Sequence, residues 1–433
     1  MLKRKITSEL SEWKQKKGKK SLIIEGARQV GKTFSIDDFA KRNYGIDNYI
    51  YINLEFNKTA RSIFDGDIDG HKIFDSLSLL YRDKFIDKNR KLLFIDEIQS
   101  YPRAITALKA LTIDNRLDVI ASGSLLGVHY NHVSSFPVGY VERMEMNPLD
   151  FEEFLWSQKI KNKEIETLKQ CYERGKQVPI VLHNEMMRLF REYVVIGGMP
   201  EIITIYNKSK DYNEVLSNQK RIIEDYRSDI AKYTIKKDKV RARECFESIP
   251  FQLGKDNKKF QYKNVSKGGR SSIYESSVQW LIDAGIVLKC NNLVVPKIPL
   301  NTYRRVDAYK LYLSDIGLLV SMLGSDAQTK ILFGDLGISK GAIYENVVGN
   351  LLHQLGYDLY YFEKGSKLEI DFIIIKDSMV TGVEVKSADN TQAKSLKSFM
   401  ENHGGEKAVK LSSKNLYYNQ KENRIPLYMI MFL

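Results

Sequence analysis

Cysteine is scarce in this chain of 433 residues, which contains only Cys171, Cys245 and Cys290. They are far apart and odd in number, so the sequence predicts neither a disulfide framework nor a zinc site of clustered thiols. Long apolar runs are also lacking, because stretches such as 426–433 are far shorter than the roughly 20 residues that cross a bilayer. The first twenty residues hold no apolar core of signal-peptide length. We therefore expect a cytoplasmic protein with no membrane partner.

The composition is that of a folded globular protein, with 43% apolar and 28% charged residues. A chain of this length has room for roughly two to four domains, each with its own core. The net charge of +13 suits a polyanionic partner such as DNA, since Lys and Arg neutralise phosphates. Solvated lysine-rich faces give the same charge, so the charge alone does not decide between the two readings.

Short apolar runs separated by helix-length stretches mark the first third of the chain. This pattern predicts an α/β domain with a parallel sheet covered by helices. The runs lie at 21–26, 48–56, 91–97 and 117–124, and a fifth candidate strand lies at 138–146. We expect the first domain to span residues 1–155.

Three further units are expected after the first domain. Residues 156–235 have helical periodicity, interrupted by the turn sequence IGGMP at 196–200, and predict a helical connector. Residues 236–330 read as helices followed by a short strand pair, a winged-helix-like order. Residues 331–433 read as a helix, three strands, a helix, a further strand and a terminal strand, which together predict a compact α/β domain.

The sequence GARQVGKT at 26–33 follows the first apolar run and fits the pattern G-x-x-x-x-G-K-[ST]. The two glycines let the backbone curl so that its N–H groups surround phosphates, and the lysine reaches the β and γ oxygens. The threonine hydroxyl is a ligand for Mg²⁺. We predict an ATP site formed by Gly26, Ala27, Arg28, Gln29, Val30, Gly31, Lys32, Thr33 and the following Phe34.

A second apolar run, LLFIDE at 92–97, ends in two carboxylates. In P-loop ATPases the first such carboxylate holds magnesium, and an adjacent glutamate polarises the attacking water. We assign these roles to Asp96 and Glu97. A solvated position at a strand end is the alternative for Glu97.

Other polar residues are candidates for sensing the γ-phosphate. Ser122 and Ser124 are predicted at the carboxyl end of a strand, and either could contact the phosphate or the water. Arg143 and Arg103 are alternative candidates for an arginine finger. A solvent-exposed position without a catalytic role is the more common environment of such arginines.

Carboxylates also cluster in the C-terminal region. Strand alternation places Glu369 and Asp371 on one face, and Glu384 and Lys386 share a face of the next strand. If the strands form a hairpin, Asp371, Glu384 and Lys386 converge, with Glu345 supplied by the preceding helix. The set resembles the D-x(n)-E-x-K constellation of restriction-endonuclease-like folds, in which the acids hold Mg²⁺ and the lysine orients water or stabilises charge. The alternatives are a solvated sheet face or a degenerate nuclease fold used for binding.

Two other groups are weaker candidates. A pair of histidines has no third candidate metal ligand near it in the sequence, which predicts a loop rather than a metal site. A mixture of aromatic and basic residues suits either a nucleic-acid surface or a solvated loop. The first group is His129 and His132, and the second is Tyr262, Lys263, Lys267 and Arg270.

Five segments together resemble the AAA-type ATPases of bacteria and archaea that end in domain of unknown function 4143, a nuclease-like region. They are GARQVGKT, LFIDEIQ, ASGSLLGV, PVGYVERMEMNPLDFEEFLW and GGMPE. The resemblance covers nearly the whole chain. It implies an AAA-like P-loop fold, the winged-helix assignment and a restriction-endonuclease-like C-terminal domain, but no settled biological role.

Two hypotheses follow from the resemblance and the motifs. In the first, the nucleotide state controls a metal-dependent nuclease that acts on DNA. In the second, the protein is an ATP-dependent switch whose C-terminal domain binds DNA or a protein partner without cutting. The oligomeric state stays open in both.

Overall fold

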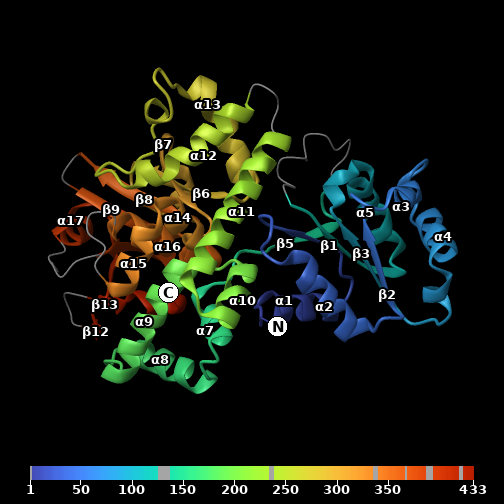
Figure 1. The fold of residues 1–433 in the computed structure, drawn as a ribbon, viewed down its shortest axis with the longest axis horizontal. Coiled ribbons are helices and arrows are strands. Elements are labelled where there is room, and N and C mark those ends of the chain that lie inside the picture. The colour runs from blue at the N-terminus through green and yellow to red at the C-terminus, as the bar shows by residue number, and fades with distance from the viewer. Residues whose placement is uncertain are drawn as a thin grey trace. The chain divides into compact units, whose positions relative to one another are not determined.

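The computed structural model describes residues 2–124, 137–233, 238–334, 340–365, 368–386, 394–418 and 423–433 (Figure 1). The chain forms two compact units, one built from residues 3–147 and the other from nearly all of residues 148–433. Within the described ranges, no helix combines the length and the apolar character that a membrane span requires.

The N-terminal unit contains a five-stranded parallel sheet with the strand order β2-β3-β4-β1-β5. Every residue of β3 and β4 is buried, which explains why the sequence of each is an almost continuous apolar run. The five predicted strands and the P-loop class of fold are confirmed. The strands are β1 (Ser21–Glu25), β2 (Tyr49–Asn53), β3 (Lys91–Asp96), β4 (Leu117–Ser122) and β5 (Val141–Glu145).

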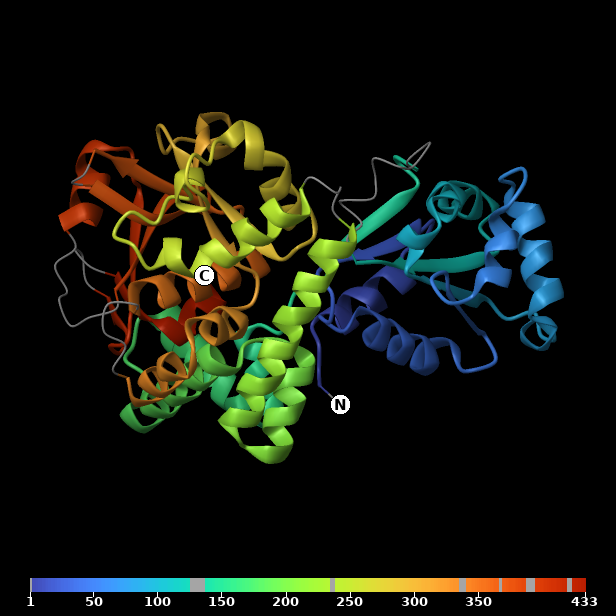
Figure 2. The ribbon, with the colours of Figure 1, turned by 45° about the horizontal axis from the view of Figure 1, so that its top comes forward.

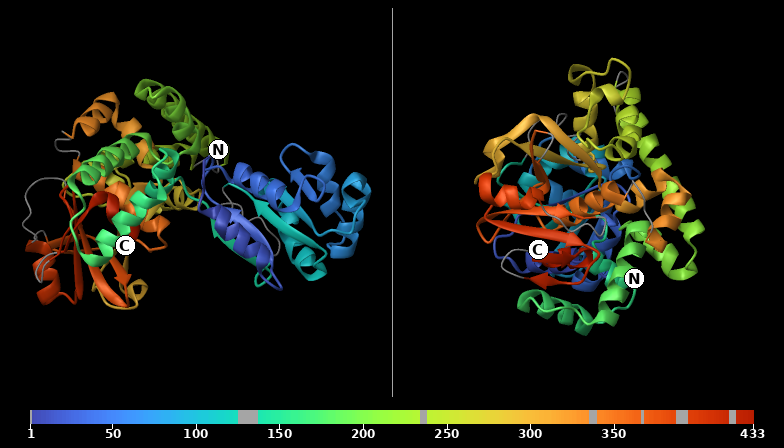
Figure 3. Two further views of the ribbon diagram at one scale, coloured as in Figure 1. Left: turned by 90° about the horizontal axis from the view of Figure 1, so that it is seen from below. Right: turned by 90° about the vertical axis from the view of Figure 1, so that its left-hand side faces the viewer.

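Helices cover both faces of this sheet, as Figures 2 and 3 show. On one face Leu22, Ile24 and Phe94 pack against α1 and α2, and on the other Ile23, Leu93 and Ile95 pack against α3, α4 and α5. The alternation of side chains along each strand thus supplies two separate cores. The helices are α1 (Ile6–Gln15), α2 (Lys32–Tyr44), α3 (Lys58–Arg61), α4 (Gly70–Leu80) and α5 (Pro102–Asp114).

The second unit begins with helices, which occupy the region where the sequence predicts a helical connector. They are α7 (Phe151–Ser157), α8 (Asn162–Arg174), α9 (Ile180–Ile196), α10 (Pro200–Ser209) and α11 (Tyr212–Tyr233). The next helices, α12 (Lys239–Leu253) and α13 (Ser271–Asp283), precede the antiparallel hairpin of β6 (Val287–Leu293) and β7 (Arg304–Leu313). This is the expected order of helices followed by a strand pair, and the winged-helix assignment itself stays a prediction. Three more helices follow: α14 (Ile316–Leu323), α15 (Ser325–Phe333) and α16 (Lys340–Gln354).

The centre of the second unit is an eight-stranded mixed sheet with the order β12-β13-β11-β10-β9-β8-β6-β7. The C-terminal strands are β8 (Tyr360–Lys364), β9 (Leu368–Lys376), β10 (Met379–Val385), β11 (Lys407–Ser412), β12 (Tyr417–Tyr418) and β13 (Asn423–Pro426). Helix α17 (Lys394–Asn402) contributes Leu396 and Phe399 to a core with Phe362, Ile370 and Ile373.

The structure divides the chain differently from the four expected domains. Strand β6 pairs in parallel with β8, so the hairpin at 287–313 continues the sheet of the C-terminal region. Leu293 of β6 lies in the same core as Phe362 and Phe399. The predicted terminal strand is shorter than expected, because the apolar run after β13 forms the 3-10 helix η8 (Leu427–Phe432). Four successive residues of this run are buried, which the alternating faces of a half-exposed strand would not allow.

The IGGMP turn holds two helices and a loop of the second unit together. The Asp315 carboxylate accepts the N–H of Gly198 at 2.6 Å and the N–H of Leu318, in the first turn of α14, at 3.0 Å. A Cβ at position 198 would lie 2.2 Å from the carbonyl oxygen of Leu149. This close backbone approach requires glycine, so the turn has a structural role.

Candidate functional site

The loop at 26–33 has the curled backbone that the motif predicts. Gly26 and Gly31 have φ angles of 144° and 94°, and Gln29 adopts a φ of 65°. A Cβ at position 26 would lie 2.2 Å from the Met146 carbonyl oxygen, so only glycine fits there. Helix α2 begins at Lys32, directly after the loop, which places its N-terminal N–H groups at the candidate phosphate site.

Lys32 points back into this loop. Its Nζ donates hydrogen bonds to the carbonyl oxygens of Gly26 at 2.8 Å and Ala27 at 2.7 Å. Burial lowers the pKa of Lys32 to about 8, even though Glu97 and Asp96 act in the opposite direction. The ammonium group is thus held in the loop by two uncharged carbonyl oxygens, and anionic phosphate oxygens would bind it more strongly.

The remaining predicted loop residues have different environments. Ala27 and Val30 are buried and belong to the core beneath the loop. Arg28 donates from Nε to the Ser124 hydroxyl at 3.2 Å. Phe34 is 59% exposed, so its side chain points away from the core.

Asp96 is the hub of a polar cluster at the carboxyl edge of the sheet. Its side chain is buried and accepts hydrogen bonds from the hydroxyls of Thr33 at 3.1 Å and Ser122, and from the backbone N–H of Glu97 at 3.1 Å. Within the described part of the chain, no lysine or arginine forms an ion pair with Asp96. A buried carboxylate beside a hydroxyl, with no cationic partner, fits the oxygen ligands that Mg²⁺ prefers. Thr33 and Asp96 are the residues that would hold the ion.

Glu97, the candidate general base, is partly buried and directly follows Asp96. It adopts a left-handed conformation with φ of 51°, and Gln99 donates to its carboxylate. Burial raises the pKa of Glu97, and the neighbouring charge of Asp96 acts in the same direction. A carboxylate with a raised pKa accepts a proton from water more readily, as the predicted role requires.

The two candidate sensor serines are separated by the structure. Strand β4 lies between β1 and β3, so Ser122 at its end reaches Asp96, whereas Ser124 contacts Arg28. Of the two, Ser122 is the one that touches the predicted magnesium ligand.

Neither candidate arginine finger lies at the Asp96 cluster. Arg103 donates to the carbonyl oxygens of Phe64 at 3.0 Å and Gly66, and so braces the loop before α4. Arg143 on β5 forms an ion pair with Glu25 at 3.6 Å. The candidate histidines at 129 and 132 lie outside the described residues.

Three further side chains contact Asp96 or Glu97, and the sequence analysis did not identify them. Tyr51 donates its hydroxyl to Asp96 at 3.0 Å, Asn53 lies 3.5 Å from the same carboxylate, and Gln99 contacts Glu97. Strand β2 lies beside β3 in a register that pairs Asn53 with Asp96. The strand order would have identified Tyr51 and Asn53, because polar residues at the carboxyl ends of adjacent parallel strands lie together.

The C-terminal carboxylates lie on the predicted hairpin. Strands β9 and β10 are antiparallel, with Val383 opposite Phe372, so Glu384 and Asp371 lie on neighbouring strands. Asp371 accepts the backbone N–H of Val385 at 2.8 Å. Glu384 is buried and forms an ion pair with Lys386.

Glu345 on α16 is already saturated by other side chains. Its carboxylate accepts hydrogen bonds from Lys310 at 2.6 Å, from Tyr312 at 2.6 Å and from Lys258. Lys310 also bonds Glu369 at 2.7 Å. Although burial alone would raise the pKa of Glu345, Lys310 and Lys258 lower it to about 2.

Asp371 lies in the electrostatic field of the same cluster. Burial, and then the negative charge of Glu345, raise the pKa of Asp371 to about 7, against the opposing effect of Lys258 and Lys310. An acid of this kind carries a proton much of the time at neutral pH, and a protonated carboxyl is a poor metal ligand.

The magnesium site predicted from Glu345, Asp371 and Glu384 stays a prediction. Among the described residues, no group of three or more His, Cys, Asp or Glu side chains could hold a metal ion. Two ammonium groups, from Lys258 and Lys310, already neutralise Glu345, whereas Asp371 and Glu384, which the structure also describes, are not bonded by either lysine.

Family models match three parts of the chain. Residues 18–155 match an AAA domain, residues 187–329 match domain of unknown function DUF8612, and residues 340–430 match domain of unknown function DUF4143. A search of curated proteins finds no match to this sequence.

Solved structures with partial similarity include three archaeal proteins. A Walker-type ATPase of Pyrococcus abyssi is 12% identical with a TM-score of 0.44, covering 75% of this chain and 96% of its own. The ORC1 protein of Aeropyrum pernix, solved with DNA, is 12% identical with a TM-score of 0.29, covering 74% of this chain and 90% of its own. Cdc6p of Pyrobaculum aerophilum is 14% identical with a TM-score of 0.23, covering 73% of this chain and 88% of its own. At these TM-scores the likeness adds nothing to the assignment by the family models.

Proposed function

Because the chain carries an AAA-type P-loop ATPase domain and a C-terminal DUF4143 domain, we propose that it is a cytoplasmic switch driven by ATP. ATP and Mg²⁺ bind at residues 26–34, and hydrolysis changes how the second unit binds its partner, DNA. The observation that carries this proposal is the Asp96 cluster, in which the predicted magnesium ligands Thr33 and Asp96 are joined at 3.1 Å and Ser122 contacts the same carboxylate.

The roles of the residues follow from their contacts. Lys32 exchanges its two carbonyl partners for phosphate oxygens, and the N–H groups of the loop surround the phosphate charge. Glu97 takes a proton from the attacking water, and Gln99 orients its carboxylate. Bound Mg²⁺ would supply positive charge to the phosphate oxygens. Ser122, the last residue of β4, bonds Asp96 and is the candidate sensor of the γ-phosphate. A contact of its hydroxyl with that phosphate would change its hydrogen bond to Asp96.

Replacing Glu97 with glutamine will slow hydrolysis without preventing ATP binding. The amide keeps the size and the hydrogen bonds of the side chain but cannot accept the proton, and general bases typically contribute about 100-fold or more to the rate. We expect steady-state ATP turnover to fall by about that factor while Kd for ATP changes less than about threefold. Glu12→Gln, on an exposed position of α1, is the matched control and keeps full turnover. A Glu97→Gln variant with unchanged turnover would refute the assigned role.

The alternative is that ATP controls metal-dependent cleavage of DNA by Asp371, Glu384 and Lys386. The bonds from Lys258 and Lys310 to Glu345 favour binding without cleavage instead. Cleavage chemistry of the D-x(n)-E-x-K type requires carboxylates that are free to share a metal ion.

Incubation of the purified protein with plasmid or branched DNA is expected to leave the DNA intact, with Mg²⁺ or Mn²⁺ and with or without ATP. Gel electrophoresis checks this prediction. Cutting that disappears in both Glu384→Ala and Lys386→Ala would establish the nuclease instead. Cutting that survives both substitutions would identify a contaminant.

A further inference from the structure

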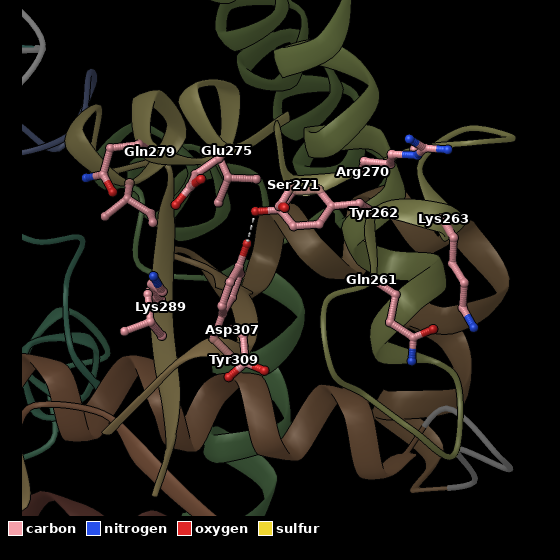
Figure 4. A pocket seen from close by; sticks show the side chains of 14 residues that line it. Gln261, Tyr262, Lys263, Arg270, Ser271, Glu275, Gln279, Lys289, Asp307 and Tyr309 are labelled. Carbon is pink, nitrogen blue, oxygen red and sulfur yellow. Dashed lines mark hydrogen bonds between the residues drawn. The ribbon is translucent and has the colours of Figure 1, made fainter. Parts of the chain in front are cut away.

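A groove lies between α13 and the β6–β7 hairpin of the second unit. Its volume is about 610 Å³, and it is lined by residues from the segment before α13, from α13 itself and from both strands. Figure 4 shows Glu275 and Gln279 of α13 on one side of the groove and Lys289 and Asp307 on the other. Helix α13 buries Tyr274, Val278 and Leu281 and turns a polar face, which includes Ser272 and Ser276, to solvent.

The segment of the chain that supplies this groove is basic, and Lys263, Arg270 and Lys289 line the groove itself. Residues 255–310 contain eleven Lys and Arg against four Asp and Glu, a net charge of +7 out of +13 for the whole chain. Lys258, Lys259 and Lys310 are neutralised by glutamates of the C-terminal region. Lys263, Lys267 and Arg270 before α13, and Arg304 on β7, are exposed and have no carboxylate within ion-pair distance among the described residues. These unneutralised cations lie on both sides of α13 in the sequence.

The wall of the groove opposite α13 includes an irregular part of β7. The register between β6 and β7 jumps from Asn291–Tyr309 to Leu293–Arg304, so residues 305–308 have no partner on β6. Val306 in this excursion is 72% exposed. Arg305 bonds Asp307 at 3.0 Å, which offsets the negative charge that Asp307 brings to the groove.

The aromatic rings of the groove are already engaged. The hydroxyls of Tyr262 and Tyr309 lie 2.6 Å apart, Tyr262 stacks on Tyr274, and Tyr309 stacks on Phe260 with Lys289 over its ring. Proteins that bind single strands stack successive bases on free aromatic faces. The faces of these rings are already covered by other side chains, so they are not available for unpaired bases. We therefore expect the groove to prefer double-stranded over single-stranded DNA.

We propose that this face binds double-stranded DNA, with α13 directed into the major groove and the 305–308 excursion against the backbone. The major groove is about 12 Å wide and admits a helix. Lys263, Lys267 and Arg270 neutralise phosphates on one side of α13, and Arg304 does so on the other. Gln279 pairs with adenine and Glu275 accepts from cytosine, which are the base contacts these side chains favour. This inference rests on the proposed switch, for which it identifies the form of DNA that is bound and the surface that binds it.

The test measures binding of the full-length chain to a fluorescent DNA duplex and to its single strand over a range of salt concentrations. The variant Lys263→Ala/Lys267→Ala/Arg270→Ala is expected to bind the duplex about tenfold or more weakly, and its salt slope should fall by about one for each lost phosphate contact. The control Lys161→Ala/Lys163→Ala/Lys169→Ala removes the same charge from exposed positions at α8 and should bind as the unaltered protein does. Unchanged thermal melting shows that each variant is folded.

Three results would overturn the inference. If the α8 control lost as much affinity for the duplex as the triple variant, net charge alone would explain DNA binding. If the unaltered protein bound the single strand more tightly than the duplex, the preference for double-stranded DNA would be wrong. Absence of duplex binding at low salt, in a protein that still hydrolyses ATP, would refute the DNA surface while leaving the ATPase assignment intact. If the unaltered protein did not hydrolyse ATP, that result would instead contradict the proposed switch.

Discussion

Replacing Lys32 with alanine will abolish tight ATP binding. The ammonium group already lies inside the loop, bonded to Gly26 and Ala27, at the position from which it can meet the phosphates. Charge-assisted bonds to phosphate are among the strongest in proteins, and losing about 3 kcal/mol of binding energy weakens affinity more than about 100-fold. Titration of a fluorescent ATP analogue measures this loss directly.

The control for this substitution lies on the same helix. Lys41→Ala removes an exposed lysine of α2, whose Nζ pairs with Asp37 at 2.6 Å, and should leave ATP affinity unchanged. Tight ATP binding by a folded Lys32→Ala protein would contradict the assignment of the loop as a phosphate site.

Replacing Lys310 with methionine will destabilise the second unit by about 3 kcal/mol or more, because it removes one of the two lysines that bond the buried Glu345 and also the lysine that bonds Glu369. Lys310 is almost fully buried and bonds both Glu345 and Glu369. Methionine fills most of the same volume, so the effect reports charge rather than a cavity. Urea unfolding, followed through the transition of the second unit, measures the change in free energy of unfolding.

Two further variants make the stability test specific. Lys259→Met removes a half-buried ion pair with Glu363 at 2.8 Å and should cost less than about 1 kcal/mol. Lys310→Met/Glu345→Gln should recover part of the stability lost in the single variant, since it removes the stranded charge. A loss below about 1 kcal/mol for Lys310→Met would show that the cluster is not a closed ionic network.

The loop at 26–33 and the carboxylates at 96 and 97 could be located from the sequence because each lies within one contiguous motif. GARQVGKT and LLFIDE each combine a buried strand with the polar residues that follow it, so one motif fixes both position and role. Tyr51 and Asn53 could not be predicted without the strand order, because neither belongs to a motif and only the pairing of β2 with β3 brings them to Asp96. The choice between Ser122 and Ser124 likewise depended on the placement of β4 between β1 and β3.

The C-terminal region was harder to predict because its decisive contacts come from distant segments. The hairpin and the flanking helices followed from alternation and turn residues, and they are confirmed. Lys258 and Lys310 approach Glu345 from 87 and 35 residues away in the chain, which no local pattern records. The same long-range pairing joins β6 to β8, so a sheet that crosses the expected domain boundaries was not visible in the composition.

The excursion at 305–308 also affects whether the edge of the large sheet can pair with the edge of a sheet in another molecule. An open sheet has two outer strands, and a straight outer strand offers a row of backbone groups to which another chain can add, the usual start of aggregation. Strand β7 is interrupted by the excursion and by the N–H of Phe260, which bonds the Tyr309 carbonyl oxygen at 2.8 Å. At the opposite end, β12 contains two residues. Among the described residues, neither edge of the sheet is a long, regular strand to which a second molecule could add. At the β7 edge, the irregularity that forms part of the groove therefore also disfavours fibrillar assembly.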